Sequence, residues 1–179
     1  LFYNHKPSGA RSFPYGPYVD ASNEPLFPFG FGLSYTQFEL SDLQLSRTEI
    51  NAGQSVEISL NVANIGRVAG DEVVQLYIRH REASVTRPIK ELKGFKRVTL
   101  QAGERKQITF TLHANQLGYF NRTMRYGLEA GKVELLIGTS SVDIKLSGEI
   151  NIGTSAEISG EQKVFFGSVD VLSGEAVAK

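Results

Sequence analysis

The heptapeptide VEISLNV at residues 56–62 alternates strictly between apolar and polar side chains. Successive side chains of a β-strand point to opposite faces, so this stretch predicts a strand with one buried and one solvated face. The same period recurs in five further segments of the chain. They are residues 38–45, 73–78, 108–112, 133–137 and 142–146. No long stretch carries a convincing helical period, and the sequence therefore predicts an all-β fold.

Turn-forming residues separate these segments. The turns are Asn51-Ala52-Gly53, Asn64-Ile65-Gly66, Ala102-Gly103 and Ala130-Gly131. Strands and turns that succeed one another at intervals of roughly 8–15 residues are typical of a β-sandwich. Because each segment has one apolar face, two such faces must meet to leave water. We predict a two-sheet antiparallel sandwich of about seven strands over residues 37–152.

The first 38 residues differ in composition from the rest of the chain. They hold ten of the 18 aromatic residues and five of the six prolines. Proline at this density interrupts helices and strand pairing, while aromatic residues need a surface on which to be buried. We therefore predict an irregular docking arm. An extended backbone between Pro25 and Tyr35 would place its candidate docking residues on one side. These residues are Phe27, Phe29, Phe31 and Tyr35.

Residues 153–179 carry a weaker pattern, with a glycine at every seventh position from Gly153 to Gly174. The stretches between these glycines do not match one another, so they do not form a repeat. Apolar residues cluster only at 164–166 and 169–171. We predict one added edge strand around residues 163–172, followed by a frayed end.

Composition excludes several classes of function. Nineteen basic and nineteen acidic residues give a formal net charge of zero, which argues against bulk nucleic-acid binding and against a basic membrane-binding surface. No run of about 18 apolar residues is present, so no membrane span is predicted. The absence of cysteine excludes disulfides, cysteine-ligated zinc and thiol catalysis. Residues 1–5 lack the features of a signal peptide, and we interpret them as part of a longer polypeptide.

No arrangement of residues predicts a catalytic centre, a metal site or a cofactor site. Asp71-Glu72 is the only adjacent acidic pair, and neighbours on a strand face opposite ways, so they cannot flank one scissile bond. The histidines, His5, His80 and His113, lack the spacing of metal ligands. Gly30-Phe31-Gly32 lacks both the third glycine and the following helix of a dinucleotide-binding loop.

The stretch from Arg79 to Arg97 is rich in cations. It holds Arg79, Arg81, Arg87, Lys90, Lys93, Lys96 and Arg97. One interpretation is a patch for an anionic polysaccharide or nucleic acid. The interpretation we favour is a solvated loop and an edge strand whose charges discourage edge pairing. A stacking platform would also require exposed aromatic residues among the charges, and we expect none here.

Three blocks of sequence go beyond a generic sandwich. They are PLFPFGFGLSYTQF at 25–38, RPIKELKGFKRV at 87–98 and EAGKVELLIGTSS at 129–141. In this order and spacing they closely resemble the carboxy-terminal part of glycoside hydrolase family 3 enzymes, the β-glucosidases of bacteria and fungi. The resemblance covers about residues 1–152. It implies an immunoglobulin- or fibronectin III-like sandwich.

The resemblance also implies a division of the chain. Residues 1–36 would be the terminal segment and linker of a missing α/β domain, 37–152 the fibronectin type III-like domain, and 153–179 a C-terminal extension. The family's catalytic residues lie on a barrel and an α/β domain, and no residue here matches their motifs. The implied partners are therefore those two domains of the same polypeptide. The resemblance favours a periplasmic or secreted location.

The implied function is that of a non-catalytic accessory module of an enzyme that hydrolyses terminal β-D-glucosyl residues. We expect no catalytic activity from this chain alone, and its exposed arm predicts self-association as one possible consequence. The alternative is a carbohydrate-binding module that presents polysaccharide to the enzyme. Its candidate aromatic residues are Tyr77, Phe95, Tyr119, Phe120 and Tyr126, and most of these occupy positions expected in the core.

Overall fold

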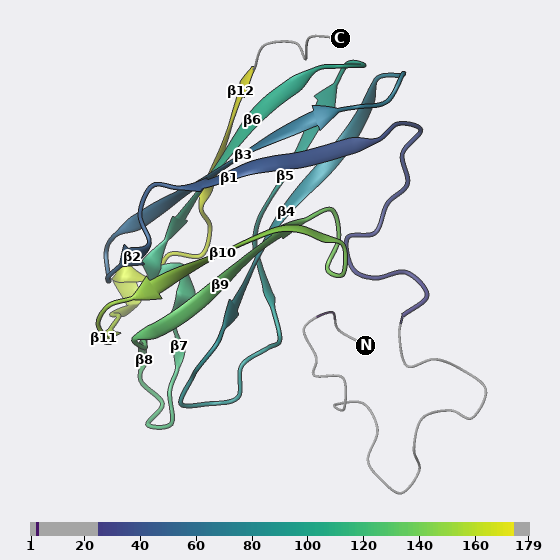
Figure 1. Ribbon diagram of the computed structural model, residues 1–179. Coiled ribbons are helices and arrows are strands. Elements are labelled where there is room, and N and C mark those ends of the chain that lie inside the picture. Colours follow the sequence, from purple (N-terminus) through teal and green to yellow (C-terminus); the bar gives the residue numbers. More distant parts are fainter. Residues whose placement is uncertain (1–2, 4–24, 174–179) are drawn as a thin grey trace, which may run out of the picture.

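The computed structural model describes residue 3 and residues 25–173, and these residues form an all-β structure (Figure 1). The first sheet has the order β1-β3-β6-β12, and all its neighbouring strands are antiparallel. Its strands are β1 (Phe38–Leu45), β3 (Ser55–Asn64), β6 (Arg105–His113) and β12 (Ser168–Ser173).

The second sheet has the order β2-β10-β9-β4-β5. Its strands are β2 (Glu49–Ile50), β4 (Gly70–His80), β5 (Glu91–Leu100), β9 (Gly131–Gly138) and β10 (Ile144–Ile152). Only the short β2 runs parallel to its neighbour. A small third sheet holds β7 (Tyr119–Phe120), β8 (Tyr126–Leu128) and β11 (Ala156–Glu157). Two 3-10 helices, η1 (Ala114–Leu117) and η2 (Gly160–Gln162), complete the described elements. None of the helices in this part of the chain is long and apolar enough to cross a membrane.

The hydrophobic core lies between the two large sheets (Figure 1). Ile58 and Leu60 of β3 are fully buried, and Glu57 beside them is exposed. On the facing sheet, Leu76 and Ile78 of β4 belong to the same core. Burying one such side chain contributes about 1.5–3 kcal/mol, so a long row of alternating residues is enough to hold two sheets together. The predicted two-sheet antiparallel sandwich is confirmed.

β4 departs from the predicted alternation. Residues 74–78 are all buried, so this part of the strand has no solvated face. Gln75 and Tyr77, which alternate with the core residues, are covered from outside the sandwich by residues of the N-terminal arm. The expectation of one solvated face is wrong for this strand, because a segment distant in sequence lies on that face.

The segment predicted at 142–146 begins later than expected. Val142 is exposed and lies in the connection between β9 and β10, outside the strand that starts at Ile144. Within that connection, Thr139 donates its backbone N–H to the carbonyl oxygen of Asp143 at 3.1 Å, and the Asp143 N–H bonds to Ser140 Oγ at 3.0 Å. Because residues 139–143 form this turn, the strand begins only at Ile144.

The stretch after residue 152 contributes a strand to the sandwich. β12 pairs with β6 at the edge of the first sheet, with Val169 opposite Phe110 and Val171 opposite Ile108. Val169 and Val171 pack against the core from this position. The predicted edge strand around residues 163–172 is confirmed, and the sandwich therefore takes in residues beyond 152.

Candidate functional site

The aromatic strap, defined here as residues 25–36, turns instead of running extended. Phe31 donates its backbone N–H to the carbonyl oxygen of Pro28 at 3.0 Å, and Gly30 has a φ of +80°. Positive φ at this position of a turn favours glycine, which has no Cβ to clash with the backbone. The turn brings the rings of Phe27 and Phe31 to a centroid distance of 5.3 Å. The expectation of an extended segment with its aromatic residues on one side is therefore wrong.

Gln75 of β4 clamps this turn to the second sheet. Its Nε2 donates to the carbonyl oxygens of Thr139, at 2.7 Å, and Gly30, at 3.3 Å. Its Oε1 accepts from the hydroxyl of Tyr77 at 2.5 Å. Gln75 is 4% exposed, and a buried amide of this kind is stable only when its donors and acceptor are satisfied. The sequence pattern gave Gln75 a solvated position, and nothing in that pattern signals its role.

Tyr3 and Phe29 cover the outer face of β4. Their rings stack at a centroid distance of 4.5 Å, and the Tyr3 ring meets Tyr77 edge-on at 5.8 Å. The Tyr3 hydroxyl accepts from the Leu92 backbone N–H at 3.0 Å. Burial raises the pKa of Tyr77 to about 12, so its hydroxyl stays protonated and keeps donating to Gln75. The other residues of the predicted arm before Pro25 lie outside the described residues.

The base of the strap is fixed by a fully buried amide. Thr36 donates its hydroxyl to Asn64 Oδ1 at 2.6 Å, and the Asn64 Nδ2 donates to the carbonyl oxygens of Val68 and Leu100. The Ile65 N–H also bonds to the Gln37 carbonyl oxygen at 2.9 Å. Asn64 was predicted as a turn residue. The structure shows that it also joins the strap to the sandwich.

The side of the strap away from the sandwich is open to solvent. Tyr35 and Leu33 are almost fully exposed, and Phe27 is 65% exposed. Phe29 and Phe31 are about half exposed. The structure thus assigns different surroundings to the predicted docking residues. Phe29 stacks on Tyr3 and its carbonyl oxygen accepts the Ser141 backbone N–H at 2.8 Å, whereas Tyr35 is fully exposed to solvent.

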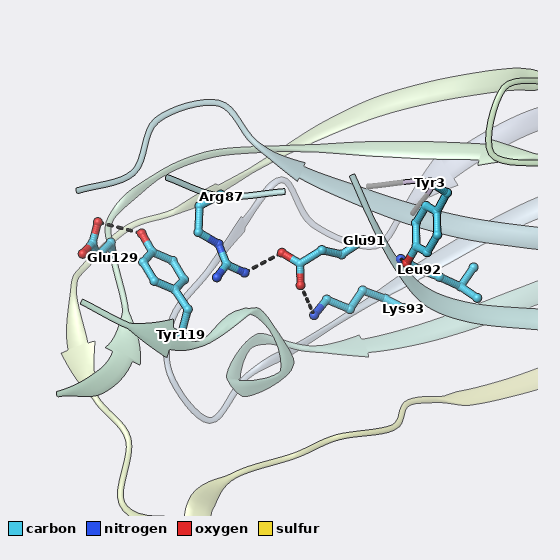
Figure 2. A network of polar contacts seen from close by, with 7 residues as sticks. All are labelled: Tyr3, Arg87, Glu91, Leu92, Lys93, Tyr119 and Glu129. Atoms are coloured by element: carbon cyan, nitrogen blue, oxygen red, sulfur yellow. Dashed lines mark hydrogen bonds and ion pairs between the residues drawn. The ribbon is translucent and has the colours of Figure 1, made fainter. Parts of the chain in front are cut away.

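A polar network lies at the start of β5, in the cation-rich stretch (Figure 2). Glu91 accepts from Arg87 at 2.5 Å and from Lys93 at 3.3 Å. The Arg87 guanidinium lies 4.2 Å from the ring centroid of Tyr119, whose hydroxyl donates to Glu129 at 2.6 Å. Burial opposes the charged form of Glu91, but Lys93 and Arg87 outweigh it and hold its pKa below the ordinary value.

The network corrects part of the prediction for this stretch. β5 is an edge strand, as predicted, but Arg87, Glu91 and Lys93 are mostly covered and not solvated. Arg81 and Arg97 are also paired, with Glu134 and Asp71. With these cations engaged, the stretch does not present a uniform positive patch.

Aromatic exposure also differs from the prediction. Phe95 is 63% exposed among the charges of β5, where no exposed aromatic residue was expected, and Phe120 of β7 is 51% exposed. Tyr77 and Tyr119 are buried, as expected of core positions, and Tyr126 is half-buried. Phe95 and Phe120 lie on different sheets, and Lys163 lies over the rings of Phe120 and Tyr126. They do not form one flat platform for a sugar chain.

Neither of the two described hollows holds a free pair of carboxylates. One hollow of about 430 Å³ includes Glu129 and Glu157. Glu157 pairs with Arg125 at 2.6 Å. Burial opposes ionisation of Glu129, but hydrogen bonds from Ser84 and Tyr119 hold its pKa below the ordinary value, opposite to the shift that a general acid needs. A second hollow, of about 410 Å³, is lined by the end of β4, the loop between β4 and β5, and Arg122, and its lining contains no carboxylate.

The histidines and the acidic pair are also placed by the structure. His80 is half-buried at the end of β4 against Tyr119, and His113 caps η1 by accepting the Asn115 N–H. The Asp71 carboxylate binds Arg97, and Glu72 accepts the Val73 N–H at 2.8 Å. Within residue 3 and residues 25–173, no three His, Asp or Glu side chains gather as metal ligands. His5 lies outside this part.

Comparison with known proteins agrees with this geometry. A model of the fibronectin type III-like domain matches residues 72–141. The chain is 41% identical over 156 residues to the thermostable β-glucosidase B of Acetivibrio thermocellus, covering 87% of this chain and 21% of that protein. It is 45% identical over 126 residues to a β-xylosidase of Formosa agariphila, covering 70% of this chain and 17% of that protein. The structure of the Listeria innocua β-glucosidase in complex with glucose superposes with a TM-score of 0.75 at 38% identity, over 86% of this chain and 22% of that one.

These matches show the class of domain to which the sandwich belongs. The sandwich is a fibronectin type III-like domain. The chain is similar to part of these β-glucosidases, and it spans about a fifth of the length of the relatives that it matches most extensively. The relatives include glucosidases and a xylosidase, so their names do not agree on one sugar.

Proposed function

We propose that the chain is a non-catalytic accessory module, which packs through its aromatic strap against the catalytic domains of a family 3 enzyme that hydrolyses terminal β-D-glucosyl residues. In this proposal, residues 1–36 end and link a preceding α/β domain, residues 37–152 form the accessory domain and residues 153–179 extend it. The observation that carries the proposal is the two-sided strap. Its turn is anchored to the sandwich through Gln75 and Tyr3, while Leu33 and Tyr35 face away.

Physical chemistry supports a docking role for the exposed side. An aromatic residue buries about 150–250 Å² when it is packed, and apolar patches above a few hundred Å² are rarely left open on soluble monomers. The anchored turn holds Phe27 and Phe31 in a fixed arrangement, so docking costs little conformational entropy. The strap also lies next to the part of the chain that connects to any preceding domain.

The role is tested in the complete polypeptide. Leu33→Ser and Tyr35→Ser should leave the fold of the accessory domain unchanged, because both side chains are exposed. They should lower the melting temperature of the catalytic domains and increase cleavage between the domains by protease. Met124→Ser, at a side chain that is 76% exposed on the β7–β8 turn, is the matched control. Strap variants that behave like this control would refute the docking role.

The non-catalytic role is tested with the chain alone. We expect no turnover of an aryl β-glucoside above the buffer blank, because a glycosidase needs two suitably placed carboxyl groups. Turnover that is abolished by Glu129→Gln or Glu157→Gln would show that the accessory interpretation is wrong. Retardation of the chain in native gels that contain cellulose, xylan or laminarin would instead support the carbohydrate-binding alternative.

A further inference from the structure

β12 presents an unprotected sheet edge. It pairs with β6 over six residues without a register shift, from Ser168 opposite Thr111 to Ser173 opposite Lys106. No described strand pairs with its other side, which forms the outer edge of the first sheet (Figure 1). A straight edge of this kind offers a row of backbone N–H and carbonyl groups to another strand.

The other sheet edges carry features that discourage such pairing. β1 is interrupted by a register shift between Ser41 and Gln44, where Asp42 has a φ of +56°. β5 has a register shift where it passes β4, and it carries Lys93, Lys96 and Arg97. β2 is only two residues long. Bulges, lysines and short length are the usual protections of edge strands, and β12 has none of them.

The residues at this edge are unusually apolar for a solvated surface. Phe166 is 88% exposed, Phe165 is 71% exposed and Leu172 is 61% exposed. The single charge of the strand is Asp170, which is exposed. Val169 and Val171 point the other way and contact the core. A strand that is fixed to the core and apolar at its ends is suited to bind a second strand.

The sequence of the edge is self-complementary in one antiparallel register. If two copies pair about a two-fold axis at Val169, Ser168 lies opposite Asp170 of the second copy and Leu172 lies opposite Phe166 of the second copy. Symmetry repeats both pairs, which gives two serine–carboxylate hydrogen bonds and two apolar contacts. An axis at Asp170 would instead place two carboxylates opposite each other. An axis at Val171 would place Asp170 opposite a leucine.

We propose that β12 is a homodimerisation edge, which joins the first sheets of two copies into one continuous antiparallel sheet. The occupant is a second copy because the register that buries Phe166 and Leu172 is also the one that gives Asp170 a hydrogen-bonding partner. This surface is separate from the aromatic strap, so the proposal does not depend on the docking role of the strap.

Sedimentation of the 179-residue chain over a concentration series tests the edge. We expect a concentration-dependent dimer. Ser168→Asp places two aspartates opposite each other at both symmetry-related positions, and it should raise the dimer Kd roughly 2- to 30-fold. Ser168→Lys instead places a lysine opposite Asp170 at both positions, and it should lower the dimer Kd by a similar factor. Leu33→Ser is the matched control for association through the strap, and it should leave the Kd unchanged.

Each outcome decides for or against the proposal. Opposite shifts for the two Ser168 variants, together with an unchanged Leu33→Ser, support pairing through β12 in this register. A chain that stays monomeric up to about 1 mM, a concentration at which even weak pairing of about 4 kcal/mol would be visible, overturns it. A dimer that Leu33→Ser dissociates and the Ser168 variants do not affect also overturns it.

Discussion

Replacing Gln75 by leucine tests how the strap is attached to the sandwich. Leucine has a similar volume but offers neither a donor for the carbonyl oxygens of Thr139 and Gly30 nor an acceptor for the Tyr77 hydroxyl. The three hydrogen bonds contribute about 0.5–1.5 kcal/mol each, and leaving a buried partner unsatisfied costs about 1–3 kcal/mol. Tyr77 is fully buried, so its hydroxyl loses its partner where water cannot replace it.

The apolar leucine recovers some of this loss, because it stays in a covered position. We therefore expect Gln75→Leu to lower the free energy of unfolding of the isolated chain by about 2–4 kcal/mol. For a chain of this size, such a change corresponds to a fall of about 5–15 °C in melting temperature. Cleavage by chymotrypsin at the strap aromatics should increase as well, because the Gly30 turn loses its clamp.

Urea unfolding followed by circular dichroism measures the effect. Gln44→Leu is the matched control, since Gln44 is an exposed glutamine near the end of β1. Its replacement should change the free energy of unfolding by less than about 0.5 kcal/mol. If Gln75→Leu also stays within that limit, the clamp does not hold the strap and the reasoning is refuted.

Further predictions concern the same turn and the network at β5. Gly30→Ala should cost about 1–3 kcal/mol in unfolding free energy, because φ is +80° and a Cβ would collide with the Gln75 amide; an unchanged urea midpoint would contradict this. Burial, reinforced by Arg87, lowers the pKa of His80 from 6.5 to about 4. The free energy of unfolding is therefore unaffected by His80 above pH 6.5. It falls by about 3 kcal/mol as the pH drops from 6.5 towards 4, because the unfolded chain binds the proton first. His80→Gln should flatten that part of the stability–pH curve, and an unchanged slope would refute the assignment. Glu91→Gln should cost about 1–3 kcal/mol, measured by chemical denaturation, by leaving the covered Arg87 cation without its carboxylate.

The alternation of apolar and polar residues along the sequence was sufficient to predict the sandwich fold. Val56, Ile58 and Leu60 repeat with the period of a strand, and a strand with one apolar face must pair that face with another sheet. Turn residues such as Gly53 and Gly103 mark where the chain reverses, and both have the positive φ that favours glycine. These are short-range properties, so they can be read without knowledge of the neighbours.

The attachment of the strap was decided only by the tertiary structure. The sequence predicted that the strap aromatics need a surface, but not that Gln75 and Tyr77 provide it, because their alternation with core residues is typical of a solvated face. Tyr3 meets Tyr77 across more than 70 residues of chain, and period-two patterns carry no information about such contacts. Asn64 is of a residue type that is common in turns. It becomes a buried anchor only because Thr36 and the Leu100 carbonyl group lie within hydrogen-bonding distance of its side chain. Sequence periodicity therefore determined which residues face the core, while long-range packing determined which of the outward-facing residues are covered.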